Sequence, residues 1–123
     1  MINWNKYQQF FKPHEFECRC GCGLLNVELE LIERLMIARD RAKFPFVITS
    51  GSRCIQHNYN VGGHKNSAHL TGHACDIWCN DMLTRGRLVK LFTESWVLFR
   101  IGLHPRFIHI DVDWDRPKGI YLY

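Results

Sequence analysis

A chain of 123 residues fits a single domain and is long enough to bury a hydrophobic core without cross-links. Its hydrophobic fraction of 46% and charged fraction of 23% are ordinary for a globular protein and argue against an intrinsically disordered chain. The net charge of +4 is scattered and forms no basic stripe with exposed aromatic residues, so it does not favour nucleic-acid binding. No apolar stretch is long enough to span a bilayer, and the first residues lack the apolar segment of a signal peptide.

The first long element that the sequence predicts is an amphipathic helix. A loop punctuated by glycines covers residues 17–23, and Asn26 then offers a helix N-cap. The helix must end before Pro45, because proline cannot continue it. Its apolar residues recur at helical spacing: Leu31, Leu35, Ala38 and Ala42.

The rest of the chain mixes short strands with helices. The β-branched and apolar residues 46–49 predict a buried strand, and a short helix is expected over 55–59. A longer helix is expected over 83–99, with an apolar stripe formed by Leu88, Leu91, Phe92 and Trp96. Further strands are expected over residues 74–79, 99–103, 107–112 and 120–123. Because helices and strands do not alternate strictly, we predict one small α+β domain over residues 1–123, with a mainly antiparallel sheet packed with helices.

Six cysteines are many for a chain of this length. Their even number permits disulfides, but without a signal peptide the oxidising compartment is not established. Three of them, Cys18, Cys20 and Cys22, are one residue apart, unlike the wider gaps that are typical of structural zinc sites. We expect most of the six to be small buried side chains or optional bridges, with a second structural metal as the less favoured alternative.

Two otherwise apolar segments carry side chains that can bind a metal. Residues 67–76 (SAHLTGHACD) contain His69 and Asp76, and residues 107–113 (FIHIDVD) contain His109. A carboxylate in an apolar strand is costly to bury unless it is paired or bound to a cation. Zinc accepts imidazole and carboxylate ligands, and a catalytic site with three of them keeps its fourth position for water. The sequence therefore predicts one zinc ion on these three side chains.

The pattern Ser-x-His-x-x-Gly-x-Ala-x-Asp over 67–76 resembles the zinc D-alanyl-D-alanine carboxypeptidase family. These metallopeptidases share their fold with the hedgehog signalling domain. Nearly the whole chain takes part in the resemblance, since further segments look like the family's N-terminal loop, central segment and last ligand strand. These segments are residues 16–23 (FECRCGCG), 50–54 (SGSRC), 57–63 (HNYNVGG) and 107–112 (FIHIDV).

The resemblance implies a role for five residues. His69, Asp76 and His109 match the zinc ligands. Arg53 matches an arginine that stabilises the developing oxyanion or holds the substrate, two tasks that suit a permanently charged guanidinium. Ser67 matches a serine that contacts the substrate backbone.

One position departs from the family pattern. Many relatives carry the general base three residues before the last histidine ligand, where this chain has Arg106. The remaining nearby candidates are Asp111, His104 and Asp113. On a strand, Asp111 shares a face with His109, roughly 7 Å along. We predict that Asp111 is the base or an electrostatic partner; the alternative is that it orients a ligand histidine.

The implied activity is zinc-dependent hydrolysis of amide bonds in peptidoglycan stem peptides. The enzyme would be a D,D-carboxypeptidase or a related endopeptidase, of the kind found in phage lytic enzymes (endolysins). We expect a monomer without a membrane span, made in the cytoplasm and acting in the periplasm or cell wall.

Two alternatives remain open from the sequence. The first is a non-catalytic, zinc-containing binding module of the same fold, which the absence of a carboxylate at position 106 favours. The second is a zinc-dependent nucleic-acid-binding protein built on Cys18, Cys20 and Cys22, although no nucleic-acid partner is expected from the charge pattern.

Overall fold

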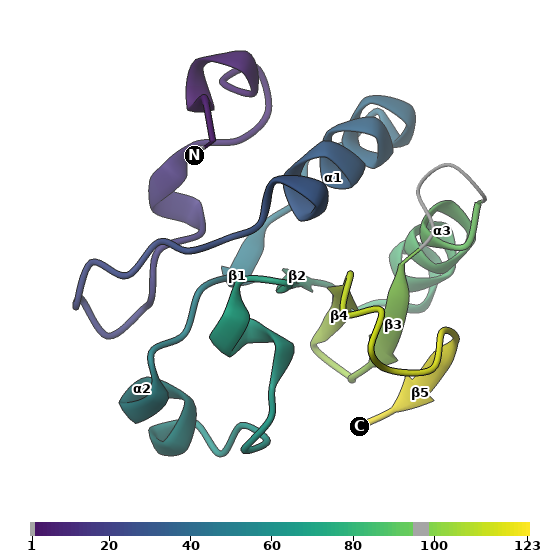
Figure 1. Cartoon of the computed structure of the whole chain (residues 1–123). Coiled ribbons are helices and arrows are strands. Elements are labelled where there is room, and N and C mark those ends of the chain that lie inside the picture. The colour runs from purple at the N-terminus through teal and green to yellow at the C-terminus, as the bar shows by residue number, and fades with distance from the viewer. Residues whose placement is uncertain (1, 95–98) are drawn as a thin grey trace.

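Five strands and three α-helices make up the regular structure of the described residues, 2–94 and 99–123, in a computed structural model of the chain (Figure 1). The strands are β1 (Ile48–Ser50), β2 (Ala74–Trp78), β3 (Arg100–Leu103), β4 (Phe107–Asp111) and β5 (Ile120–Leu122). The α-helices are α1 (Leu29–Ala42), α2 (Ile55–Asn60) and α3 (Met82–Phe92). Three short 3-10 helices complete the set: η1 (Trp4–Lys6), η2 (Pro13–Glu15) and η3 (Ala68–Thr71).

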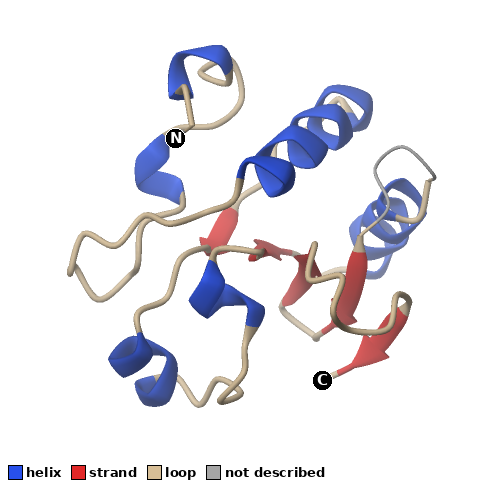
Figure 2. Ribbon diagram, viewed as in Figure 1, coloured by secondary structure: helices blue, strands red, loops and turns tan. Residues whose placement is uncertain are grey.

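The strands form one sheet in the order β1-β2-β4-β3-β5 (Figure 2). All neighbouring strands are antiparallel except β3 and β5, which run parallel. The predicted α+β class with a mainly antiparallel sheet is therefore confirmed. Among the described residues, no helix combines the length and the apolar character needed to cross a membrane.

The two faces of the central strands have different chemistry, because successive side chains of a strand point to opposite sides. On β2 and β4, one face carries the buried apolar side chains of Cys75, Ile77, Ile108 and Ile110. This face joins the hydrophobic core, to which the packed helices α1 and α3 contribute Leu31, Leu35, Leu88, Leu91 and Phe92. The opposite face carries Asp76, His109 and Asp111, so the sheet separates the core from the polar residues singled out above.

Two predicted helix boundaries were wrong. Helix α1 begins at Leu29 with Glu28 as its N-cap, and Asn26 does not cap it. Asn26 instead joins two loops, because its backbone N–H donates to Oγ of Ser52 and its side-chain amide donates to the carbonyl oxygen of Leu70. This tertiary role outweighs the local preference of asparagine for an N-cap.

Helix α3 is shorter than the predicted helix over 83–99. It ends at Phe92, whose carbonyl oxygen accepts the N–H of Phe99, the residue before β3. Leu88, Leu91 and Phe92 are buried as the apolar stripe predicts, whereas Trp96 lies outside the described residues. The first strand is also displaced, from the predicted 46–49 to Ile48–Ser50.

Gly72 places η3 against the loop that leads into α1. Its φ of +78° lies in the left-handed region, where a side chain is strained. Its carbonyl oxygen accepts the N–H of Glu28 at 2.8 Å, and a Cβ at this position would lie 2.6 Å from the carbonyl carbon of Asn26. Only glycine therefore allows this close approach of two backbones, which fixes the position of η3.

We expect Gly72→Ala to lower the free energy of unfolding by about 2 kcal/mol or more, because it adds left-handed strain to a clash with rigid backbone. Chemical denaturation of the two proteins would measure the difference. The matched control is Gly86→Ala in α3, where a Cβ would meet no atom within 4 Å. That change should raise stability by about 0.5–1 kcal/mol through helix propensity. Equal effects of the two substitutions would contradict the close-approach explanation.

Candidate metal centre

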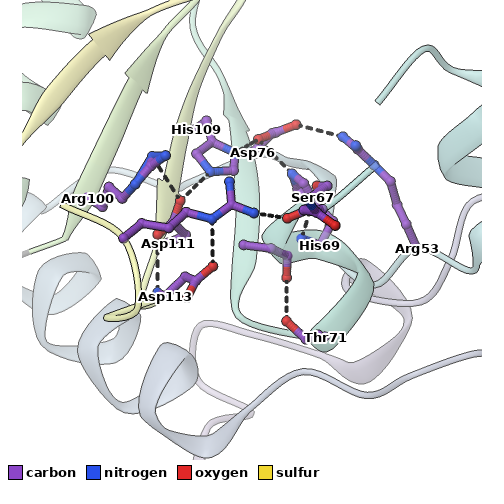
Figure 3. Close-up of polar contacts among 12 residues, drawn as sticks. Arg53, Ser67, His69, Thr71, Asp76, Arg100, His109, Asp111 and Asp113 are labelled. Carbon is purple, nitrogen blue, oxygen red and sulfur yellow. Dashed lines mark hydrogen bonds and ion pairs between the residues drawn. The ribbon is translucent and has the colours of Figure 1, made fainter. Parts of the chain in front are cut away.

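Antiparallel pairing of β2 with β4 sets Asp76 directly opposite His109. Side chains of such a pair project from the same face, and here Nδ1 of His109 lies 2.9 Å from Oδ1 of Asp76. His69 reaches the same oxygen from η3, with its Nε2 3.2 Å away (Figure 3). The three predicted ligands thus come together from a 3-10 helix and two strands, and all three are buried.

Each histidine is held from behind by a second hydrogen bond. Nδ1 of His69 lies 2.8 Å from the carbonyl oxygen of Gly51, and Nε2 of His109 lies 2.7 Å from Oδ2 of Asp111. A carbonyl or carboxylate accepts a proton from the ring nitrogen that it faces, which leaves the other ring nitrogen as a lone-pair donor. The nitrogen that faces Asp76 in each ring is therefore the one that would bind a metal ion, in place of its hydrogen bond with the carboxylate.

The buried position of these groups shifts their protonation. Burial lowers the pKa of His69, which favours the neutral ring that a metal ligand requires. Burial alone would lower the pKa of His109 too, but its hydrogen bonds with Asp111 and Asp76 outweigh burial and raise it. Burial would raise the pKa of Asp76, but hydrogen bonds from His109 and His69 hold it well below its ordinary value. Asp76 is consequently a carboxylate at neutral pH.

Arg53 neutralises the second oxygen of this carboxylate. Its Nη2 lies 3.3 Å from Oδ2 of Asp76, and the ion pair is largely shielded from solvent. The guanidinium also donates from Nη1 to Oδ1 of Asn58 at 3.1 Å and from Nε to Oγ of Ser50 at 3.1 Å. A guanidinium has five N–H groups, so these contacts fix its plane and leave two donors for another partner.

These residues fit a zinc ion. One nitrogen of each histidine and one carboxylate oxygen converge so that the three donor atoms lie within 4.8 Å of one another. Two imidazoles and one carboxylate form a ligand set that is typical of catalytic zinc, with the fourth position left for water. The partners behind the histidines, Gly51 and Asp111, are of the kind that orients metal ligands.

A pocket of about 560 Å³ opens onto the centre. Its lining includes Arg53 and Ser67, the two predicted substrate-binding residues. The hydroxyl oxygen of Ser67 accepts the N–H of His69 at 3.2 Å, so this serine caps η3 beside the ligand. The wall also contains three residues that sequence analysis did not single out: Arg100 of β3, Tyr121 of β5 and Tyr123, which follows β5.

The ring of Tyr121 lies near His109 because the residue between them on β3, Gly102, has no side chain. The register aligns Gly102 of β3 with His109 on one side and with Tyr121 of β5 on the other. A Cβ on residue 102 would meet the Tyr121 ring, whose centroid lies 6.0 Å from that of His109. Strand alternation could have indicated Arg100 and Gly102 as residues of the polar face, but the parallel pairing of β5 has no local signal in the sequence.

Two of the three candidates for the general base, Asp111 and His104, lie in different surroundings. Asp111 is buried, and its Oδ1 accepts the N–H of Asp113 while its Oδ2 faces His109. His104 is half-buried, stacks on Phe107 with ring centroids 4.1 Å apart and lines the pocket. Nδ1 of His104 accepts the N–H of Arg106 at 3.0 Å, so the proton of the neutral ring is on Nε2.

A second group of potential metal ligands lies outside this centre. The sequence-based expectation of buried thiols fits Cys75 and Cys79, but Cys20 and Cys22 are exposed. The thiols that gather form what we call the cysteine cluster: Cys18, Cys20, Cys22 and Cys54. Burial raises the pKa of the Cys18 thiol, but hydrogen bonds from backbone groups and neighbouring thiols outweigh burial and bring it to about 7.

Comparison with known proteins agrees with the geometry of the first centre. A family model described as Peptidase M15 matches residues 9–111, which is most of the chain and includes the three predicted ligands. No curated protein sequence matches the chain.

Because Asp111 fixes the tautomer of His109, we expect Asp111→Asn to weaken zinc binding at this centre about 10- to 100-fold without removing a ligand. A zinc titration followed through the ring NMR signals of His69 and His109 would report this centre separately from the cysteine cluster.

The control is Asp115→Asn, which should bind zinc like the wild type, because this aspartate is exposed and only its backbone N–H, which the substitution keeps, contacts Asp113. Unchanged zinc affinity in Asp111→Asn would contradict the orienting role.

Proposed function

Because the chain belongs to the peptidase M15 family, we propose that it hydrolyses an amide bond in a peptidoglycan stem peptide with zinc held by His69, Asp76 and His109. The observation that carries the proposal is the convergence of three buried side chains, whose potential ligand atoms lie within 4.8 Å of one another, beside a pocket. Zinc, when bound, lowers the pKa of a water molecule to about 7 and polarises the scissile carbonyl.

Arg53 and Ser67 lie where a peptide backbone would enter. In this proposal the two N–H groups that Arg53 keeps free stabilise the negative charge that develops on the carbonyl oxygen. Its ion pair with Asp76 holds the guanidinium in place, so little reorganisation is needed when charge develops. In the same proposal Ser67, which caps η3 and lines the pocket, contacts the substrate backbone.

The proton-transfer step depends on Asp111 or His104. The contacts of Asp111 favour an orienting role, because its oxygens are occupied by His109 and by the N–H of Asp113. Because Nδ1 of His104 accepts the N–H of Arg106, its Nε2 carries a proton, which suits a hydrogen bond to a substrate carbonyl better than proton abstraction. We therefore propose that Asp111 positions His109, and that His104 contacts the substrate.

The charge around the pocket supports a substrate with carboxylate groups. Three arginines line the pocket: Arg53, Arg100 and Arg116. Among the described residues, Nη1 of Arg100 is buried without a hydrogen-bond partner, and Oδ2 of Asp111 lies 3.7 Å from it. A guanidinium of this kind can take a carboxylate through two parallel hydrogen bonds. Stem peptides carry such groups, and a terminal carboxylate in this position would favour carboxypeptidase action over internal cleavage.

We propose the periplasm or cell wall as the place of action, since that is where such a substrate occurs. A non-catalytic zinc module of the same fold remains the second candidate. Two observations favour it: Arg106 stands where many relatives carry the base, and the nearby carboxylate of Asp111 is engaged on both oxygens.

Wild-type protein loaded with zinc should release D-alanine or cleaved stem peptide from purified peptidoglycan, and His69→Ala should lose this activity by about 100-fold or more. Mass spectrometry of the soluble products would identify the bond that is cut. If zinc-loaded wild type releases nothing, the peptidase proposal fails and the binding module is favoured. The same assay on Asp111→Asn at saturating zinc separates the two roles of Asp111. Recovered activity indicates an orienting group, and persistent loss indicates the base.

Arg100→Gln should raise KM for a stem peptide with a free terminal carboxylate by about 10-fold or more, because a charge-assisted hydrogen bond contributes roughly 1.5–3 kcal/mol. With an amidated terminus, wild type and variant should differ little. The exposed Arg87→Gln on α3 is the matched control and should not change KM. Equal losses of Arg100→Gln on both peptides would show that this arginine does not read the carboxylate.

A further inference from the structure

The cysteine cluster joins two parts of the chain that are distant in sequence. Three of its members lie on the loop after η2, and Cys54 is the N-cap of α2. Figure 1 shows this loop beside the segment that leads from β1 into α2. Cys54 supplies the fourth thiol, so the one-residue spacing of the other three is not the whole ligand pattern.

The separations between the sulfur atoms suit a shared metal ion. The Sγ atoms of Cys18 and Cys20 are 3.5 Å apart, and those of Cys20 and Cys54 are 3.7 Å apart. Four sulfurs bound to zinc at about 2.3 Å in a tetrahedron lie about 3.8 Å from one another. A disulfide needs about 2.05 Å. All four sulfurs lie within 4.8 Å of one another, close to the size of a tetrahedral site.

Backbone N–H groups point at the sulfur atoms. The N–H of Cys54 donates to Sγ of Cys18 at 3.4 Å, and the N–H of His57 donates to Sγ of Cys54 at 3.3 Å. Such donors stabilise negative charge on sulfur, and thiolate is the form of cysteine that binds a metal. The buried Cys79 differs from these thiols. Its S–H donates a hydrogen bond to the carbonyl oxygen of Asp81 at 3.7 Å, whereas the thiols of Cys18 and Cys54 accept hydrogen bonds from backbone N–H groups.

The loop has the backbone that this arrangement requires. Gly21 and Gly23 have φ values of +87° and +83°, and each directly follows a cysteine of the cluster. A Cβ on either glycine would meet no atom within 4 Å, so the left-handed backbone conformation is the reason for glycine there.

We propose that the cysteine cluster is a second metal site, a tetrathiolate site for a zinc-like divalent ion with a structural role. Four thiolates close the coordination of zinc, so such a site has no open position for a substrate. Two of its thiols are exposed, which gives the ion a path of entry from solvent.

An ion in this site would also support the first centre. The segment of residues 51–54 connects them: the Gly51 carbonyl holds His69, Arg53 pairs with Asp76, and Cys54 belongs to the cluster. The N–H of Ser52 donates to the carbonyl oxygen of Phe16, just before the cysteine loop. The ion would therefore fix both ends of the backbone that orients the two ligands.

The test uses the full chain, purified under reducing conditions and loaded with zinc or cobalt. The wild type should bind two zinc ions per chain, and cobalt should give the intense near-ultraviolet absorption of thiolate-to-metal charge transfer. A site of two histidines and one aspartate cannot give that absorption. Cys20→Ser combined with Cys22→Ser should remove one zinc equivalent and the charge-transfer band, and both substitutions are at exposed positions.

Two controls make the result specific. Cys79→Ser changes a buried thiol outside the cluster and should keep two zinc ions and the full band. His69→Ala should lose one zinc ion but keep the band. A wild type without the charge-transfer band would overturn the proposal even if the double variant failed to fold. So would a double variant that keeps both zinc ions, or cysteines joined as disulfides under these conditions.

The spectroscopic readout is independent of peptide hydrolysis. A protein with the thiolate band but no peptidase activity would retain the second metal site and lose the proposed function. A protein that cleaves peptidoglycan without the band would show the reverse.

Discussion

The burial of one carboxylate, that of Asp76, determines the arrangement of the site. An isolated charge removed from water costs several kcal/mol, so a carboxylate that is 3% exposed needs partners on every side. The structure provides His109 from the neighbouring strand, His69 from η3 and Arg53 from the loop after β1. Each partner lies on a different segment, so the carboxylate that we propose as a metal ligand also holds three parts of the fold together.

The division of the sheet into two faces makes this possible. The core face of β2 and β4 is apolar throughout and packs against α1 and α3, which fixes the register of both strands. A shift of one residue would bury Asp76 in that core and turn Ile77 outward. Hydrophobic packing on one face therefore sets the distances between polar groups on the other.

Residues that surround the three proposed ligands connect the metal centre to the strands of the sheet. Gly51, Asp111 and Arg100 lie behind the ligands and connect them to β1, β4 and β3. The same β1–α2 segment reaches the cysteine cluster, so the two groups of proposed metal ligands share one stretch of backbone. A small domain with few long helices gains rigidity from such shared elements, which is what a site that must hold two histidine rings in fixed tautomers requires.

Much of this protein follows from its sequence. The apolar spacing in α1 and the polar residues inside two apolar strands are local signals, and they indicated the α+β class, the helix and the three ligands. Tertiary structure decided what depends on distant partners: the start of α1, because Asn26 bonds to Ser52 and Leu70; the place of Asp111 behind His109; and the addition of Cys54 to three closely spaced cysteines. Hydrophobic periodicity and ligand chemistry are properties of a segment, whereas a cross-strand register or a cluster of thiols exists only once the chain has folded back on itself.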